Sequence, residues 1–406
     1  MSNQETPFNI AIPDSDLDLL KRKLELHRFP DELEDSEWDY GVPLPEMERL
    51  TKYWKDVYIP NKWREEEATL NRELPQFTKG IEVEGYGTLS IHYVHQKSKV
   101  VDAIPLLFVH GWPGNFLEAR KILPLLVEAS PDHPSFHVVA LSLPGFGFSD
   151  GPKQKGFALP QYAEVCNKLM LSLGYNEYAT QGGDWGSVIT RENALRHGKK
   201  HVKAWHTNFP LGELPSLKRP LLLLSHFIFG HSAKETAGLA RSKRFLEKGT
   251  GYFKEQATAP QTIGYSLADS PVGLLAWIYE KLATGTDEYK WTDDEVLTWI
   301  SIYWFSKAGP TASARIYYEA MKASPKAFSS TVDTGIPTGY SYFPKEISQL
   351  PRSWLWVPSL VFESEQEKGG HFAAHEVPEL LVRDLRKMFG KGSPAYGVVP
   401  GKTGYK

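Results

Sequence analysis

The chain has 406 residues, which is enough for two or three domains or for one large domain with an insertion. Its 46 Lys and Arg against 49 Asp and Glu give a formal charge of −3, which argues against nucleic acid or an anionic membrane as the main partner. The single cysteine, Cys166, excludes an intramolecular disulfide and a cysteine-based zinc site. The polar, acidic N-terminus lacks the features of a signal peptide, and no apolar run approaches the ~20 residues of a membrane span, so we expect a soluble, cytoplasmic protein.

The first half of the chain changes character near residue 100. Residues 1–100 are rich in charge, and Leu17, Leu20 and Leu24 recur at helical spacing, so we expect a mainly helical N-terminal segment. From 101 to 209, helical stretches alternate with short apolar runs, at 104–109, 137–143, 178–181 and 202–209. This alternation predicts an α/β fold, with a mostly parallel sheet flanked by helices.

The alternation stops between 210 and 325. Helical patterns in this block lie at 221–229, 274–282, 294–305 and 312–321, so we expect an all-helical insertion. The α/β pattern resumes from 326 to 406, with strands predicted at 335–343 and 359–362 and a closing helix at 375–389.

The most informative motif is Gly-Gly-Asp-Trp-Gly at 182–186, between a predicted strand and a predicted helix. It has the form of a nucleophile elbow, in which small residues two positions before and after the nucleophile allow the sharp turn. With Asp184 at the centre, a carboxylate would attack an sp³ carbon and form an alkyl ester, which water would then hydrolyse. The alternative is a tight glycine turn with an aspartate that caps the helix.

Hydrolysis of such an ester needs donors for the oxyanion. Backbone N–H groups would serve, one from Trp185 after the nucleophile and one from the His-Gly-Trp-Pro-Gly loop at 110–114. We assign the second donor to Trp112.

A general base and an acid that orients it should follow the nucleophile in the chain. His371 lies on a predicted loop before the last helix, where the base is expected, whereas His375 is interpreted as a helix cap or a solvated ring. Glu346 follows the penultimate predicted strand and is the favoured acid. The alternatives are Asp333, interpreted as a turn residue, and Glu363, Glu365 and Glu367, interpreted as a solvated charge run.

Together these motifs resemble the microsomal-type epoxide hydrolases of the α/β-hydrolase superfamily, including their soluble fungal relatives. The resemblance covers nearly the whole chain and includes the motifs at 33–36, 110–114, 142–149, 181–187, 269–274 and 369–374. It implies an α/β-hydrolase fold with an N-terminal meander around the core and a helical lid inserted after the sixth strand. It also implies two lid tyrosines that hydrogen-bond the epoxide oxygen, matched to Tyr252 and Tyr317, with the adjacent Tyr318 left open as the second donor.

The activity that this resemblance implies is the conversion of an epoxide and water to a vicinal diol, without a metal or organic cofactor. The expected partners are a small apolar epoxide and water, with no nucleic acid and no membrane anchor; a homodimer is allowed for. A haloalkane dehalogenase also uses an elbow aspartate and would use the Trp185 ring as a halide donor. The non-enzyme alternative is an inactive hydrolase fold that binds an apolar ligand.

Overall fold

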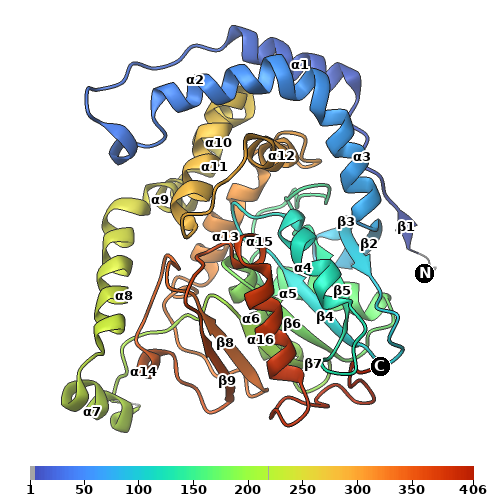
Figure 1. Ribbon diagram of the computed structural model, residues 1–406, viewed down its shortest axis with the longest axis vertical. Coiled ribbons are helices and arrows are strands. Elements are labelled where there is room, and N and C mark those ends of the chain that lie inside the picture. The colour runs from blue at the N-terminus through green and yellow to red at the C-terminus, as the bar shows by residue number, and fades with distance from the viewer. Residues whose placement is uncertain (1–4, 218) are drawn as a thin grey trace.

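The computed structural model describes residues 5–217 and 219–406, and its centre is one twisted sheet (Figure 1). Within these residues the strand order is β1-β2-β3-β5-β4-β6-β7-β8-β9. The strands from β1 to β5 in this order pair antiparallel, and those from β5 to β9 pair parallel. The strands are Thr6–Pro7 (β1), Gln76–Val83 (β2), Gly87–Gln96 (β3), Ile104–Val109 (β4), Phe136–Leu141 (β5), Tyr178–Gly182 (β6), Val202–Thr207 (β7), Thr338–Tyr342 (β8) and Leu360–Glu365 (β9).

Strand β4 lies where the order of the parallel strands reverses. Its chain successor β5 pairs on one side and β6 on the other, and all six of its residues are buried. A continuous apolar run is expected of a parallel strand that is covered on both faces. Ligands of open α/β sheets bind at the carboxyl ends of the strands at such a reversal, so the loops after β4 and β6 are placed for function.

Helices cover both faces of the sheet. Helix α4 packs on α16, and α5 packs on α6 on the other side (Figure 1). The helical elements of this layer are η3 Phe116–Glu118, α4 Ala119–Leu126, α5 Leu159–Ser172, α6 Trp185–His197, α14 Arg352–Leu355, α15 Ala373–Glu376 and α16 Pro378–Phe389.

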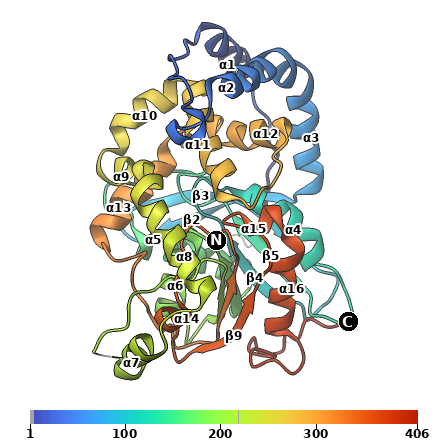
Figure 2. The same ribbon diagram turned by 60° about the vertical axis from the view of Figure 1, so that its left-hand side comes forward.

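The N-terminal helices lie against the inserted helices. Leu17, Leu20 and Leu24 are buried, as their spacing predicts, and the Tyr58 hydroxyl is 2.8 Å from the Thr298 hydroxyl of α12. Figures 1 and 2 show the N-terminal helices together with α10 (Pro260–Asp269), α11 (Pro271–Gly285) and α12 (Asp293–Trp304) above one end of the sheet, whereas α7 (Pro220–Phe229) lies near the other end. The N-terminal elements are α1 Asp14–Leu26, η1 Glu37–Tyr40, α2 Leu44–Tyr53, η2 Trp54–Lys62 and α3 Trp63–Glu73.

The expectation of a mainly helical segment up to residue 100 is wrong for its last third, where β2 and β3 form a hairpin. Gly85 and Gly87 in the turn both have positive φ, at 77° and 75°, which glycine adopts without strain. Because β3 pairs with β5, the hairpin belongs to the sheet of the core.

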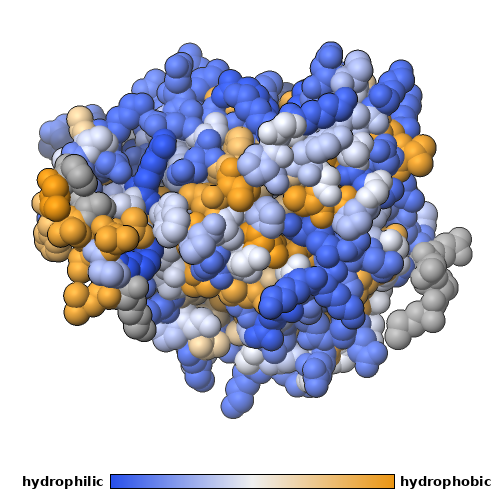
Figure 3. Space-filling model, turned by 90° about the horizontal axis from the view of Figure 1, so that it is seen from below, coloured by the Kyte–Doolittle hydropathy of each residue, from blue (hydrophilic) through white to orange (hydrophobic). Residues whose placement is uncertain are grey.

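The inserted helices, from α7 to α13, follow β7 and are called the lid below. The resemblance implied an insertion after the sixth strand. Here it follows the seventh, because the two-residue β1 adds one strand at the N-terminus. The elements are α7 Pro220–Phe229, α8 Ala233–Arg244, η4 Phe245–Gly249, α9 Gly251–Thr258, α10 Pro260–Asp269, α11 Pro271–Gly285, α12 Asp293–Trp304, η5 Ala312–Ala314 and α13 Arg315–Ala323. Figure 3 shows apolar side chains gathered on α7, where Leu221 and Phe227 are 80% and 73% exposed. Within the described residues, no helix combines the length and apolarity that crossing a bilayer requires.

Two elements near the C-terminus differ from their predictions. The closing helix is divided into α15 and α16, because Pro378 at the first position of α16 cannot continue the hydrogen bonding of α15. Strand β9 is longer than expected and includes Glu363 and Glu365, whose side chains are exposed at this edge of the sheet.

Candidate active site

Asp184 occupies a sharp turn between β6 and α6. Its φ of 49° lies in the left-handed region, which is strained for a residue other than glycine. A Cβ at Gly182 would overlap the carbonyl oxygen of Gly186, and a Cβ at Gly186 would overlap that of Val109 in β4. The small residues of the motif are therefore required by close backbone contact, as a nucleophile elbow requires.

The loop after β4 supplies a donor to Asp184. The N–H of Trp112 donates to Asp184 Oδ1 at 2.7 Å, and a Cβ at Gly111 would overlap the same carboxylate. His110 holds the start of this loop: its Nε2 accepts from the Leu143 N–H, so its Nδ1 carries the proton and donates to the Gly111 carbonyl. Burial lowers the pKa of His110 to about 4, so the ring is neutral and structural.

His371 lies between Asp184 and Glu346. Its Nε2 is 3.4 Å from Asp184 Oδ2, and its Nδ1 is 2.6 Å from Glu346 Oε1. Glu346 is 2% exposed, and its Oε1 also accepts the N–H of Ile347. A ring whose two nitrogens face carboxylates in this way can accept a proton at Nε2 while Nδ1 remains held.

The two carboxylates control the protonation of His371. Burial by itself lowers the pKa of the imidazole, but the charges of Glu346 and Asp184 outweigh it and hold the pKa well above its usual value. Esterification of Asp184 would remove one of these charges and lower the pKa of His371, so the ring can lose its proton and be neutral, as a proton acceptor must be, once the ester has formed.

Two lid tyrosines pack against the tryptophans that flank Asp184. The ring of Tyr252 (α9) stacks on Trp112 with centroids 5.0 Å apart, and Tyr317 (α13) packs edge-to-face on Trp185 at 4.9 Å. Burial, together with the charge of Asp184, raises the pKa of both phenols well above 10, so both carry their protons. Tyr318 instead lies beneath the ammonium group of its neighbour Lys322, 5.5 Å from the ring centroid.

The alternative acids have other partners. Asp333 accepts the N–H of a turn residue, Glu363 accepts a tyrosine hydroxyl, and Glu365 pairs with a lysine and an arginine. Glu367 is exposed. Within the described residues, the structure brings only Glu346 of these five acids to His371.

His375 is neither a helix cap nor solvated. Its ring is 6% exposed and stacks on Trp291 with centroids 4.7 Å apart and planes at 6°. Its Nε2 lies 3.3 Å from both Glu295 and Lys121, so it belongs to a polar cluster between α4, α12 and α15. The sequence could not indicate this position, because these partners are distant in the chain.

Three further residues near the site were missed in the sequence. Trp299 and Tyr303 of α12 donate to the carbonyl oxygens of residues 113 and 114, both at 2.6 Å, and so fix the loop that carries Trp112.

Burial raises the pKa of Glu118 to about 8 against the opposing effect of His371, so this acid is largely protonated at neutral pH. Its carboxyl occupies the space that a Cβ at Gly114 would fill. The nearness of Glu118 to the His-Gly-Trp-Pro-Gly motif was the available signal.

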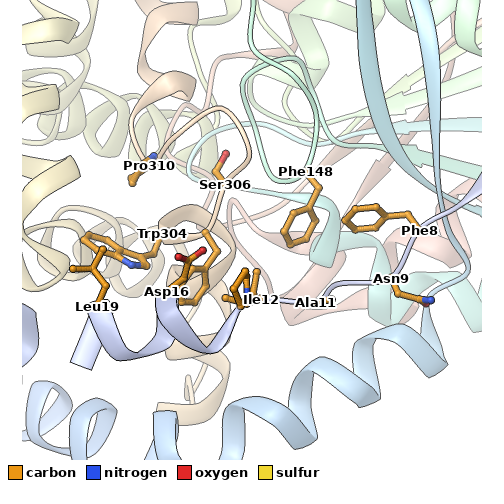
Figure 4. A pocket seen from close by; sticks show the side chains of 12 residues that line it. Phe8, Asn9, Ala11, Ile12, Asp16, Leu19, Phe148, Trp304, Ser306 and Pro310 are labelled. Carbon is orange, nitrogen blue, oxygen red and sulfur yellow. The ribbon is translucent and has the colours of Figure 1, made fainter. Parts of the chain in front are cut away.

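Of two cavities in the molecule, one reaches a site residue and the other does not. A cavity of about 690 Å³ between α8 and the ends of β8 and β9 is lined by Glu346 and Asn208, and so reaches the acid of the site. The cavity of about 410 Å³ in Figure 4 lies between the N-terminal segment and the end of α12, with Phe8, Phe148 and Trp304 in its wall and none of the predicted site residues. In the described part of the chain, no three His, Cys, Asp or Glu side chains are grouped as metal ligands would be.

Comparison with known proteins agrees with this geometry. Residues 5–119 match the family model of the epoxide hydrolase N terminus, and residues 104–226 match that of the α/β hydrolase fold. A putative epoxide hydrolase of Stigmatella aurantiaca is 41% identical, over 95% of this chain and 84% of that protein. Epoxide hydrolase 1 of Sus scrofa is 36% identical, over 95% of this chain and 88% of its own. The crystal structure of juvenile hormone epoxide hydrolase from Bombyx mori superposes with a TM-score of 0.83 at 31% identity, covering 95% of this chain and 93% of that one. The α/β-hydrolase fold predicted from the sequence is thereby confirmed.

Proposed function

This chain belongs to the epoxide hydrolase family and converts epoxides and water to vicinal diols, and we propose that it does so through an alkyl ester on Asp184. The observation that carries this mechanism is the position of the Asp184 carboxylate, which one N–H donor holds at Oδ1 and one imidazole faces at Oδ2.

In the first step, Asp184 Oδ2 attacks a ring carbon of the epoxide, and the C–O bond on the far side of that carbon breaks. Tyr252 and Tyr317 hydrogen-bond the ring oxygen, and one phenol gives its proton to the alkoxide as the ring opens. Their rings and those of Trp112 and Trp185 surround the reacting carbon with apolar surface, which suits a small apolar epoxide.

In the second step, water attacks Cγ of the Asp184 ester. His371 Nε2 takes one proton from the water while Glu346 holds Nδ1, and negative charge develops on Oδ1. The N–H groups of Trp112 and Trp185 stabilise this oxyanion, each by about 3–4 kcal/mol if other oxyanion holes are a guide. The Cγ–Oδ2 bond then breaks, Oδ2 leaves with the diol and takes the proton from the imidazolium, and the second water proton returns to the tyrosinate.

The test uses a small panel of epoxides that includes styrene oxide, with diol as the measured product. We expect turnover by the wild-type chain and none by Asp184→Ala. Diol formation by Asp184→Ala at the wild-type rate would contradict the role of this carboxylate. In His371→Ala the ester should accumulate, so the intact mass should rise by one styrene oxide; an unmodified protein that still binds the epoxide would refute the two-step scheme.

One observation favours a second candidate, a haloalkane dehalogenase. Within the described residues, the buried indole Nε1 of Trp185 has no hydrogen-bond partner and could bind a halide. Release of chloride from chloroalkanes, without diol from styrene oxide, would support this candidate and contradict the epoxide mechanism.

A further inference from the structure

The loop that carries His371 has three consecutive N–H donors, of which two bind the segment at the end of a lid helix and one binds α15. We call residues 369–371 the base loop and residues 285–288 the lid connection, which begins at the last residue of α11. Gly369 N–H donates to Asp287 Oδ2 at 2.8 Å, and His371 N–H donates to the Gly285 carbonyl at 2.8 Å. Between them, Gly370 N–H donates to Glu376 Oε1 at 2.7 Å.

Glu376 joins the two segments with one carboxylate. While Oε1 accepts from Gly370 in the base loop, Oε2 accepts the N–H of Asp287 in the lid connection at 2.9 Å. The segments are in close contact here, because a Cβ at Gly370 would lie 2.6 Å from the Gly285 carbonyl oxygen. The carboxylate is thus the acceptor that bridges the base loop and the lid.

The surroundings of Glu376 disfavour the charged form of its side chain. Burial raises its pKa to about 7, although two N–H donors act in the opposite direction. The charged groups that face it are Asp287 of the lid connection and Glu346 of the loop after β8, which are acids as well. No ion pair of Glu376 is present among the residues that the structure describes. A half-buried acid with these neighbours lowers stability, so its two directed hydrogen bonds point to a role in placing the base loop.

We propose that Glu376 is a positioning residue that fixes His371 by tying the base loop to the lid connection. The proposal rests on the proposed function, in which His371 acts only on the ester. Asp184 is held by Trp112, and the two phenols are held on α9 and α13, so the groups that open the epoxide do not depend on the base loop. Loss of the bridge should therefore slow hydrolysis of the ester and leave its formation unchanged.

The test is a single-turnover reaction of the full chain with styrene oxide, in which rapid quenching and intact mass follow formation and decay of the alkyl-enzyme. The variants are Glu376→Ala, Glu376→Gln and the matched control Glu379→Gln, which changes an exposed acid at the start of α16. We expect ester formation within twofold of wild type in all three. Decay should slow at least tenfold in Glu376→Ala, by less in Glu376→Gln, whose amide oxygen can still accept one N–H, and not in the control.

The outcomes separate the proposal from the mechanism on which it rests. If His371→Ala accumulates the ester and Glu376→Ala hydrolyses it at the control rate, the positioning role is wrong and the mechanism stands. Equal slowing of both steps would indicate a general structural role and would also overturn the proposal. Absence of any alkyl-enzyme in His371→Ala would contradict the mechanism itself. If Glu376→Ala does not fold, Glu376→Gln carries the comparison, because it keeps the shape of the side chain; ester decay in Glu376→Gln at the rate of the Glu379→Gln control would then overturn the positioning role.

Discussion

Replacement of Glu346 by glutamine tests how much of the hydrolytic step depends on the charge behind His371. Glu346 Oε1 lies 2.6 Å from His371 Nδ1, and both side chains are buried. The amide oxygen of the substituted glutamine can keep the bonds to His371 and to the Ile347 N–H, so the change removes charge with little change of shape. It should therefore lower the pKa of His371 and weaken its hold on the proton of water.

The expected loss lies between two limits. A hydrogen bond to a charged group is worth about 1.5–3 kcal/mol and a neutral one about 1 kcal/mol, a difference of about 0.5–2 kcal/mol, so the lower limit is set near ~1 kcal/mol. Leaving the imidazolium of the second step buried without its counter-charge costs about 3–5 kcal/mol. At ~1.4 kcal/mol for each tenfold change in rate, ester hydrolysis should slow by about 5- to 4,000-fold.

The assay is the decay of the alkyl-enzyme in a single turnover at neutral pH, with Glu367→Gln, an exposed acid before the base loop, as the matched control. Formation of the ester should change by less than a few-fold in either variant. Hydrolysis in Glu346→Gln within twofold of the control would refute the reasoning, because it would mean that the charge of Glu346 does not act on His371.

Three further predictions follow from the geometry of the site. Gly186→Ala should unfold at much lower temperature or fail to fold, because its Cβ would overlap a β4 carbonyl oxygen, whereas Gly251→Ala, whose Cβ meets open space, should melt as wild type does; equal melting of the two would contradict the elbow geometry. Glu118 has a pKa of about 8 in the folded protein and an ordinary one when unfolded. As pH rises from 5 to 8, the unfolding free energy of wild type relative to Glu118→Gln should therefore fall by at most ~1.4 kcal/mol per pH unit. Urea unfolding across this range measures the difference, which would stay flat if the pKa of Glu118 were ordinary. Tyr317→Phe should slow ester formation by about 10²–10³-fold, as loss of one oxyanion donor does in other enzymes, and Tyr318→Phe should not; the reverse order in stopped-flow measurements would reassign the donor.

The parts of the fold and site that are local in sequence could be predicted. The turn at Asp184 depends on small residues two positions away on each side, and the stripe of Leu17, Leu20 and Leu24 depends on helical spacing, so a short window contains the whole pattern. Tyr252 and Tyr317 carried no such local signal. They were identified only by resemblance to a family, because nothing in a helical window indicates which phenol faces a distant carboxylate.

The parts that were missed depend on contacts between distant segments. Strand β2 does not alternate regularly between buried and exposed positions along its length, so its pairing with β3 and not its own pattern determines its structure. His375 looked like a helix cap because Trp291 and Glu295, which bury it and bond it, lie about 80 residues earlier in the lid. Glu376 was passed over for the same reason, since its second acceptor bond is to Asp287 of the lid connection.

The formation of an ester on Asp184 is the central claim, and the fate of oxygen tests it most directly. A single turnover of excess enzyme with styrene oxide in ¹⁸O-labelled water should place the label in the peptide that contains Asp184, and the first diol should carry the unlabelled carboxylate oxygen. Label in the diol and none in the enzyme would show that water attacks the epoxide in one step, and would contradict the account.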